Sequence, residues 1–195
     1  MSDGQIIKNY GATFEDDGIF SITTTNDNKY LFAGSYTGHL KQICLERREV
    51  VHDYGRIHDN SISCLETTRD SKWLITGSWD KHVKRISVDK RQVDTDFGQV
   101  CDNWITGMKI TADDEKLFVA DCKGHLKLIS LRDGDVIKDF GQVHDSWISG
   151  ILITVDKKFF FTSSLIGVLK QWSYEDITLV RDHGQIINYI RTLCL

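Results

Sequence analysis

The sequence predicts an all-β protein built from four repeats, each made of four short antiparallel strands. A period of 43 residues runs through the chain, and one glycine marks it in every repeat: Gly55, Gly98, Gly141 and Gly184. Within a repeat, apolar segments of strand length alternate with polar turns about every ten residues, and no segment keeps the periodicity of an amphipathic helix. A fixed period of this length is typical of stacked supersecondary units that bury their apolar faces against each other.

The third repeat shows the predicted strands in order. Residues 105–111 alternate well enough for a first strand, and a polar turn follows. The short apolar segment 116–120 is the second strand, and residues 126–131 are the third. After a hairpin turn that contains Gly134, residues 136–140 form the fourth. The predicted unit is therefore an antiparallel meander.

The other repeats place the same strands at equivalent positions. The second strand lies at 30–33, 73–76 and 159–162, and the third starts at 39, 82, 125 and 168. A four-stranded unit of about 43 residues has the size of one blade of a β-propeller. We therefore predict a single domain over residues 1–195, a propeller of four blades that forms a closed, open or partial ring. Its repeats span approximately 12–55, 56–98, 99–141 and 142–184, with a partial fifth repeat at 185–195.

Composition limits the classes of function. The formal net charge of −4 argues against nucleic acid or an anionic membrane surface as the main partner. No apolar segment approaches the length of a membrane span, and the N-terminus lacks the pattern of a secretory signal. The five cysteines are odd in number and never form Cys-x-x-Cys, which favours reduced thiols and a cytoplasmic protein.

The second repeat carries the motifs of a known family. His58 precedes the strand residue Ile62 by four positions, and Thr76-Gly77-Ser78-Trp79-Asp80 and Val83-Lys84 follow. In these motifs and in its period, the chain resembles the WD-repeat family of β-propellers. The resemblance implies a structural hydrogen-bond relay through His58, Thr76 and Asp80 that locks the blade. Ile86 stands where the family has the tryptophan of that relay.

The other repeats depart further from the family pattern. Cys101 replaces the histidine in the third repeat, and Thr37, Lys123 and Ile166 replace the turn aspartate. Trp172 is the one tryptophan at the relay position, and Ser173 follows it where the family has aspartate. The chain therefore resembles a divergent branch of the family.

The ends of the chain bear on whether the ring closes. In the family, a fourth strand from the N-terminus commonly completes the last blade, and residues 5–10 resemble such a strand. Residues 179–183 already supply the last repeat with a fourth strand, and residues 186–195 begin another first strand. An open edge invites pairing with another chain. Three alternatives follow: a truncated fragment of a larger propeller, a homodimer of about eight blades, or an open arc.

We expect no catalytic, cofactor-binding or metal site, and no enzyme activity. His39, His82 and His125 recur at the repeat period, so they lie on different blades and are interpreted as structural. The His-Asp pairs at 58–59 and 144–145 also recur with the repeat, and no nucleophile accompanies them. One lysine in the third strand of each repeat lies opposite its apolar neighbours, and we expect these lysines to be solvated: Lys41, Lys84, Lys127 and Lys170.

Aromatic residues are the remaining candidates for a functional surface. Trp104 and Trp147 lie just before the first strands of their repeats, and Tyr36 and Trp79 lie in the turn between second and third strands. In the family, both loops emerge on the face that commonly receives partner peptides. Tryptophan and tyrosine are enriched among residues that dominate binding energy. We predict a protein-interaction face formed by Tyr36, Trp79, Asp80, Trp104 and Trp147; the alternative is that Trp104 and Trp147 fill gaps between blades.

The predicted function is therefore a non-catalytic scaffold for protein–protein interaction, with proteins or peptides as partners. One alternative is a structural unit that assembles with copies of itself through open strand edges. The other is a truncated fragment of a larger propeller.

Overall fold

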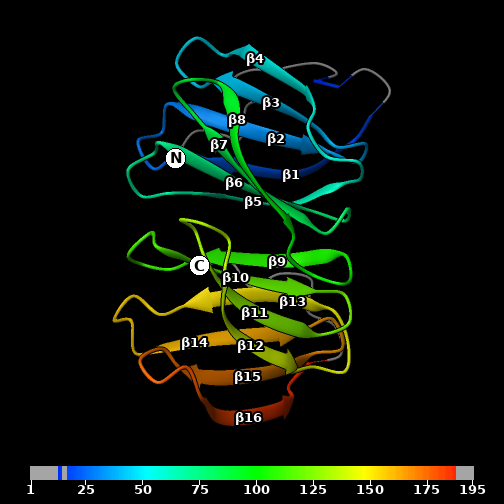
Figure 1. Ribbon diagram of the computed structural model, residues 1–195, viewed down its shortest axis with the longest axis vertical. Helices are drawn as coiled ribbons and strands as arrows, with labels where there is room; N and C mark the ends of the chain where they lie inside the picture. Colours follow the sequence, from blue (N-terminus) through cyan, green and yellow to red (C-terminus); the bar gives the residue numbers. More distant parts are fainter. Residues whose placement is uncertain (1–12, 15–16, 188–195) are drawn as a thin grey trace, which may run out of the picture.

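The computed structural model describes residues 13–14 and 17–187, and the regular structure within them is antiparallel β-sheet (Figure 1). Sixteen strands form four sheets of four, and each sheet is a meander in which consecutive strands pair. We call the sheets blades one to four in chain order. The predicted strand at 5–10 and residues 188–195 of the predicted partial fifth repeat lie outside the described residues.

The strands follow the 43-residue period. Blade one comprises β1 (Ile19–Thr24), β2 (Tyr30–Ser35), β3 (His39–Cys44) and β4 (Glu49–Arg56). Blade two comprises β5 (Ile62–Thr67), β6 (Trp73–Ser78), β7 (His82–Ser87) and β8 (Gln92–Gln99). Blade three comprises β9 (Ile105–Ile110), β10 (Lys116–Asp121), β11 (His125–Ser130) and β12 (Val136–Gln142). Blade four comprises β13 (Ile148–Ile153), β14 (Phe159–Ser164), β15 (Val168–Ser173) and β16 (Leu179–Gln185). The predicted all-β fold with four antiparallel blades is confirmed.

Local sequence closes the first hairpin of every blade. A threonine directly follows the first strand, and its hydroxyl lies 2.5–2.7 Å from the carboxylate of the aspartate two residues later, in the pairs Thr25–Asp27, Thr68–Asp70, Thr111–Asp113 and Thr154–Asp156. In each loop the same carboxylate accepts a backbone N–H, as Asp70 does from Lys72. This is the local turn chemistry expected of short polar side chains, so these loops need no bound ion to hold their shape.

A lysine on the third strand of every blade pairs with an aspartate on the fourth. The Nζ to Oδ2 distances are 3.0–4.0 Å in the pairs Lys41–Asp53, Lys84–Asp96, Lys127–Asp139 and Lys170–Asp182. Each aspartate also accepts the N–H of the glycine two residues later at 2.8 Å. The lysine side chains are only 18–20% exposed, so the expectation that they are solvated is wrong. The alternation of side chains along the third strand places these lysines on the face opposite their apolar neighbours. That pattern cannot show that this second face of the blade is also covered.

The core lies between blades rather than inside any one of them. Each of three apolar clusters combines residues of consecutive blades: Phe32 and Leu40 pack with Ile62, Ile75 packs with Ile105 and Met108, and Phe118 packs with Phe160 and Trp172. A single four-stranded sheet could not bury these side chains, so neighbouring blades stabilise each other.

The blades follow one another around a common centre. The first strands pack in the order β1, β5, β9 and β13, and no comparable contact joins β13 to β1 among the described residues. In Figure 1, β4 and β16 lie at opposite ends of the long axis, and the four first strands lie between them. The described residues therefore form an arc of four blades.

Candidate protein-interaction surface

Blade two contains the hydrogen-bond relay implied by its motifs. His58 Nδ1 lies 2.8 Å from Asp80 Oδ2, and His58 Nε2 lies 2.8 Å from Thr76 Oγ1. Because a carboxylate only accepts, Nδ1–H donates to Asp80, which fixes the ring. Burial raises the pKa of Asp80, but the hydrogen bond and charge of His58 and two backbone N–H groups outweigh it and hold that pKa well below its usual range. The relay ties the loop before β5 to the turn after β6.

Blade four contains a related relay with a different missing member. His144 Nε2 lies 2.8 Å from Thr162 Oγ1, which also accepts the Trp172 indole N–H at 3.0 Å. Ile166 occupies the position of Asp80, and the buried Nδ1 of His144 has no hydrogen-bond partner among the described residues. Burial lowers the pKa of His144 to about 4, and the nearby Lys170 charge adds to this.

Blades one and three replace the relay with apolar residues. Phe14 and Ala33 hold the histidine and threonine positions in blade one, and Cys101 and Val119 hold them in blade three. All four are buried. Losing histidine and threonine together avoids a buried unpaired group, which costs more than losing the hydrogen bond itself. At these positions, blades two and four are stabilised by hydrogen bonds, and blades one and three are stabilised by apolar packing.

Five aromatic side chains from all four repeats form one cluster. We call it the aromatic cluster: Phe20, Tyr36, Trp79, Trp104 and Trp147. The rings of Trp79 and Trp104 are stacked with centroids 4.7 Å apart, and Trp147 meets both of them edge-on at 6.5 and 6.2 Å. Phe20 contacts Tyr36 at 4.5 Å and Trp79 at 5.1 Å. The structure therefore brings the four sequence-predicted aromatic residues into continuous contact.

The cluster is partly covered and partly open. Tyr36 is 49% exposed, Trp104 41% and Trp147 37%, whereas Phe20 and Trp79 are half-buried. These rings pack on each other across blades, and they still present large apolar surface to solvent. Such a surface is rare on a soluble protein unless something binds it. Sequence reasoning missed Phe20, because it occupies a position where the other repeats have Ser63, Thr106 and Ser149.

Asp80 belongs to both predicted sets, the relay and the interaction face, and its observed contacts are those of the relay. Its carboxylate accepts from His58, from the backbone N–H of Asp59 at 2.9 Å and from that of His82 at 2.9 Å. The side chain is only 12% exposed. Asp80 therefore lies beside Trp79, but its carboxylate oxygens accept hydrogen bonds within the blade. These hydrogen bonds hold the turn that carries the Trp79 side chain.

The aromatic cluster lies at one end of a cavity between the four blades. This cavity, of about 970 Å³, is lined by the first strands of all four blades and by Phe20, Tyr36, Trp79 and Trp147. Its walls are largely apolar, with Met108 and Ile151 among them. One ion pair crosses between blades, with Lys109 Nζ 3.1 Å from Glu66 Oε1. A concave apolar space with few polar groups is the usual form of a binding site.

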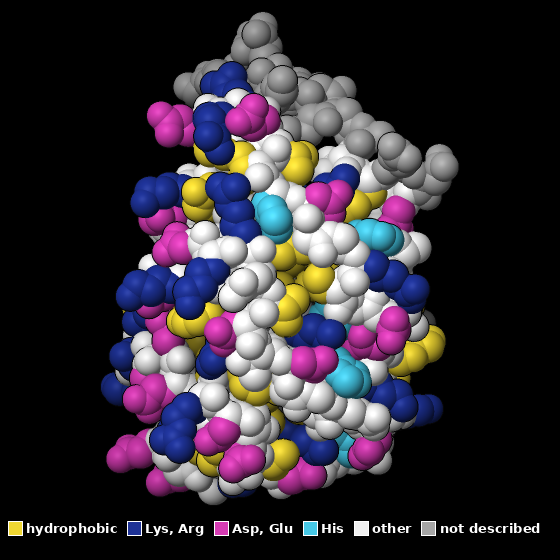
Figure 2. Space-filling model, turned by 45° about the horizontal axis from the view of Figure 1, so that its top comes forward, with side chains coloured by type: hydrophobic (Ala, Val, Ile, Leu, Met, Phe, Trp, Pro, Cys, Tyr) yellow, Lys and Arg dark blue, Asp and Glu magenta, His cyan; other side chains and the backbone are white. Residues whose placement is uncertain are grey.

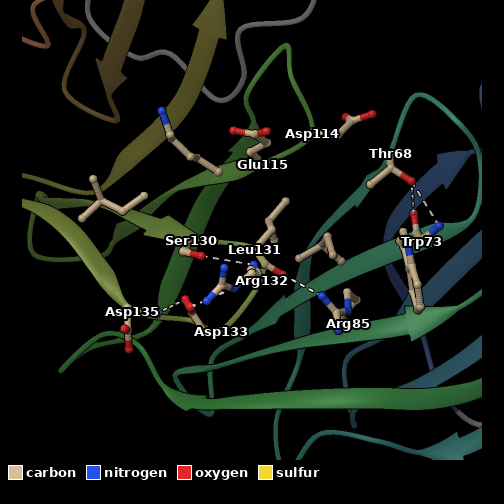
Figure 3. A pocket seen from close by; sticks show the side chains of 13 residues that line it. Thr68, Trp73, Arg85, Asp114, Glu115, Ser130, Leu131, Arg132, Asp133 and Asp135 are labelled. Carbon is tan, nitrogen blue, oxygen red and sulfur yellow. Dashed lines mark hydrogen bonds and ion pairs between the residues drawn. The ribbon is translucent and has the colours of Figure 1, made fainter.

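A second cavity lies between blades two and three, away from the cluster (Figure 3). It has a volume of about 670 Å³, and Asp114, Glu115, Asp133 and Asp135 are among its lining residues. Its arginine is already engaged, because Arg85 donates to the Leu131 carbonyl at 2.7 Å and packs over the Trp73 ring at 4.8 Å. Arg85 therefore joins blades two and three. The described residues that line this cavity do not form a set of polar groups directed at one ligand.

The described residues show no site for a metal or a membrane span. No group of three or more histidine, cysteine, aspartate or glutamate side chains among them could hold a metal ion. No helix in the described part of the chain is long and apolar enough to cross a membrane. On the face shown in Figure 2, acidic, basic and histidine side chains are intermixed with small apolar areas.

The four blades define the protein as a β-propeller, and the aromatic cluster is its candidate functional site. Residues 50–85, which include His58, Thr76 and Asp80, match the family model described as "WD domain, G-beta repeat". The chain thus contains a segment similar to a WD repeat, at blade two. No curated protein matches it.

Among solved structures, the fold is similar to a chain in the "Crystal Structure of Mitotic Checkpoint Complex". The TM-score is 0.80 at 14% sequence identity, over 90% of this chain and 54% of that chain. The protein described here therefore spans about half the length of that chain, and the similarity concerns the fold.

Proposed function

We propose that this protein is a non-catalytic, cytoplasmic scaffold that binds a peptide segment of another protein on the aromatic cluster. The observation that carries the proposal is the continuous contact of Tyr36, Trp79, Trp104 and Trp147 at one end of the cavity between the blades. The WD repeat and the propeller fold support a role in protein interaction.

The chemistry of the surface indicates the kind of segment that fits. Stacked indoles offer flat apolar faces on rigid side chains, so these side chains would lose little conformational entropy on binding an aromatic or aliphatic anchor. The acceptors of Asp80 are already used, and the Lys109–Glu66 pair is internal to the cavity. An apolar anchor is therefore expected to bind better than a strongly charged one.

The test selects peptides from a displayed library on the immobilised chain and measures their affinity for variants. Trp104→Ala and Trp147→Ala should each weaken a selected peptide by about 30-fold, the effect of a hot-spot residue worth about 2 kcal/mol. Val136→Ala is the matched control, because Val136 is a large apolar residue that is 51% exposed and lies outside both the aromatic cluster and the cavity.

Stability measured on the same variants separates binding from packing. If Trp104→Ala and Trp147→Ala bind as tightly as the parent, the peptide site is elsewhere. If they lower the free energy of unfolding by several kcal/mol, these rings fill gaps between blades, and the aromatic cluster is part of the core.

A further inference from the structure

The outer face of blade four exposes positions that the other blades bury. Phe32, Ile75 and Phe118 occupy one repeat position, and Leu40, Val83 and Leu126 occupy another; all six are 0–1% exposed, beneath the next blade. In blade four the same positions are Phe161 and Leu169, and both are only half-buried. Blade four thus carries the apolar surface on which a following blade would pack.

The outer face of blade one shows the reverse pattern. Leu65, Met108 and Ile151 hold one position of the first strand and are 6–9% exposed against the preceding blade. In blade one this position is Ile22, which is 63% exposed. Likewise Ile62, Ile105 and Ile148 are 0% exposed, and their counterpart Ile19 is 48% exposed. Blade one therefore carries the surface that would pack on a preceding blade.

A polar ladder shows the same incomplete series. Ser21, one residue after Phe20, donates to the Ile62 carbonyl of the next blade at 2.6 Å. Ser63 and Thr106, which share one repeat position, donate to the carbonyls of Ile105 at 2.6 Å and Ile148 at 2.8 Å. Ser149 is next in the series, and its hydroxyl is instead 3.4 Å from atoms of Ser163 in its own blade. The matching acceptor is the carbonyl of Ile19, on the exposed face of blade one.

A fourth strand supplies a further contact at the periphery, between blades three and four. Lys138 on β12 donates to the Ile177 carbonyl of blade four at 2.6 Å. Arg181 holds the same position on β16 and is exposed. Blade four therefore offers a donor together with its apolar surface, at the position that joins blades three and four.

We propose that blade four of one copy of this chain packs on blade one of a second copy, in the register of the three internal interfaces. Apolar packing of Ile22 against Phe161 and Leu169, and a hydrogen bond from Ser149 to the Ile19 carbonyl, hold the contact. A two-fold axis along the central cavity makes the same contact twice and gives a closed ring of eight blades.

A second copy is the occupant because one chain carries both complementary faces. Each of the three apolar interfaces joins the second- and third-strand residues of one blade to first-strand residues of the next. The free face of blade four therefore matches the free face of blade one, and neither face matches itself. In a ring of two copies, both free faces of each chain are covered. If the same head-to-tail contact did not close into a ring, further copies would add to it and form an open filament.

The experiment measures the mass of the full chain by sedimentation from 1 to 100 μM, roughly the concentrations at which a micromolar contact forms. The parent should sediment at twice the chain mass of 22.3 kDa. Ile22→Glu and Leu169→Glu should each give a monomer over this range, and Arg181→Glu, at an exposed site, should weaken the dimer at least tenfold. Val136→Glu adds the same charge at a position that is exposed in every blade, where Val50, Val93 and Leu179 are its counterparts, and it should leave the dimer unchanged.

Mixing the variants tests the pairing of unlike faces. Ile22→Glu retains its blade-four face and Leu169→Glu retains its blade-one face, so an equimolar mixture should recover dimers with one intact interface. A monomeric parent at all concentrations overturns the proposal. So does a dimer that only one of the two variants disrupts, because that contact would join like faces. Circular dichroism on each sample verifies folding, and Arg181→Glu keeps the test decisive if Leu169→Glu fails to fold.

Discussion

At the scale of single residues, the structure explains how the repeats tolerate the loss of the family's relay. Blade two keeps histidine, threonine and aspartate, and blade four keeps histidine, threonine and tryptophan. Blades one and three have apolar residues at the histidine and threonine positions and so leave no unpaired polar group at those positions. Blade four is the exception, because His144 Nδ1 is buried without a partner among the described residues. It is the position at which the relay is weakest.

His144 makes stability depend on pH. In the unfolded chain its pKa is near the ordinary 6.5, and in the fold burial lowers it to about 4. Between these values the unfolded chain binds the proton more readily, so stability is complete above pH 6.5 and is lost as the pH falls toward 4. The loss should approach about 3 kcal/mol. Urea unfolding of the parent and of His144→Gln across this pH range measures it, since the variant should lack this part of the slope.

A second substitution tests the cause of that shift. Ile166→Asp places a carboxylate where Asp80 stands in blade two, so it should raise the pKa of His144 and flatten the slope between pH 6.5 and 4. Ile166→Ala is the control for loss of the isoleucine. An unchanged pKa of His144 in Ile166→Asp, read by NMR titration, would show that the two blades do not share this geometry.

At the scale of elements, repeated glycines do two different tasks. Gly98 has φ of 75° and follows the aspartate that accepts its N–H, and a Cβ there would meet nothing within 4 Å. Gly124 has φ of 83°, and a Cβ there would overlap the carbonyl oxygen of His144. The first glycine serves backbone conformation alone, and the second also lets the loop before blade four approach closely.

These roles predict unequal costs for the same substitution. Gly98→Ala should lower the free energy of unfolding by about 1–2 kcal/mol, the cost of a left-handed conformation. Gly124→Ala should cost at least about 3 kcal/mol, because the backbone must also move. Chemical denaturation of the two variants compares them directly. Equal costs would mean that the loop at His144 relaxes freely.

The elements themselves follow from local sequence. The Thr-x-Asp loops and the Asp-x-Gly segments specify turns through hydrogen bonds within a few residues, and those were readable as turn signals. The partial burial of the four lysines could not be predicted from the sequence, since alternation assigns a side chain to a face but does not show what covers that face.

At the scale of the whole molecule, the blades differ in how many neighbours they have. Blades two and three are packed on both faces, whereas blades one and four each have one face without a neighbouring blade among the described residues. Stability in such an array is close to a sum over blades and their contacts. The end blades are therefore expected to open first.

Hydrogen exchange measures this order. Amides of β6 and β10, in the central blades, should exchange more slowly than those of β2 and β14 at low protein concentration. If two copies pair through their end blades, protection of β2 and β14 should rise with concentration, and Ile22→Glu should abolish that rise. Equal protection in all four blades at the lowest concentration would contradict the order proposed for the blades.

The sequence by itself determined the repeat, the strand positions, the turns and the relay of blade two. It did so because these depend on residue types at short range and on a period of 43 residues. It also indicated aromatic loops, but each of those rings comes from a different repeat. Only the tertiary structure decided that Trp79, Trp104 and Trp147 touch each other, that Phe20 joins them, and that Asp80 is used within its own blade. The exposed faces of blades one and four were likewise decided in three dimensions, because the same residue types are buried in one blade and exposed in another according to which neighbour is present.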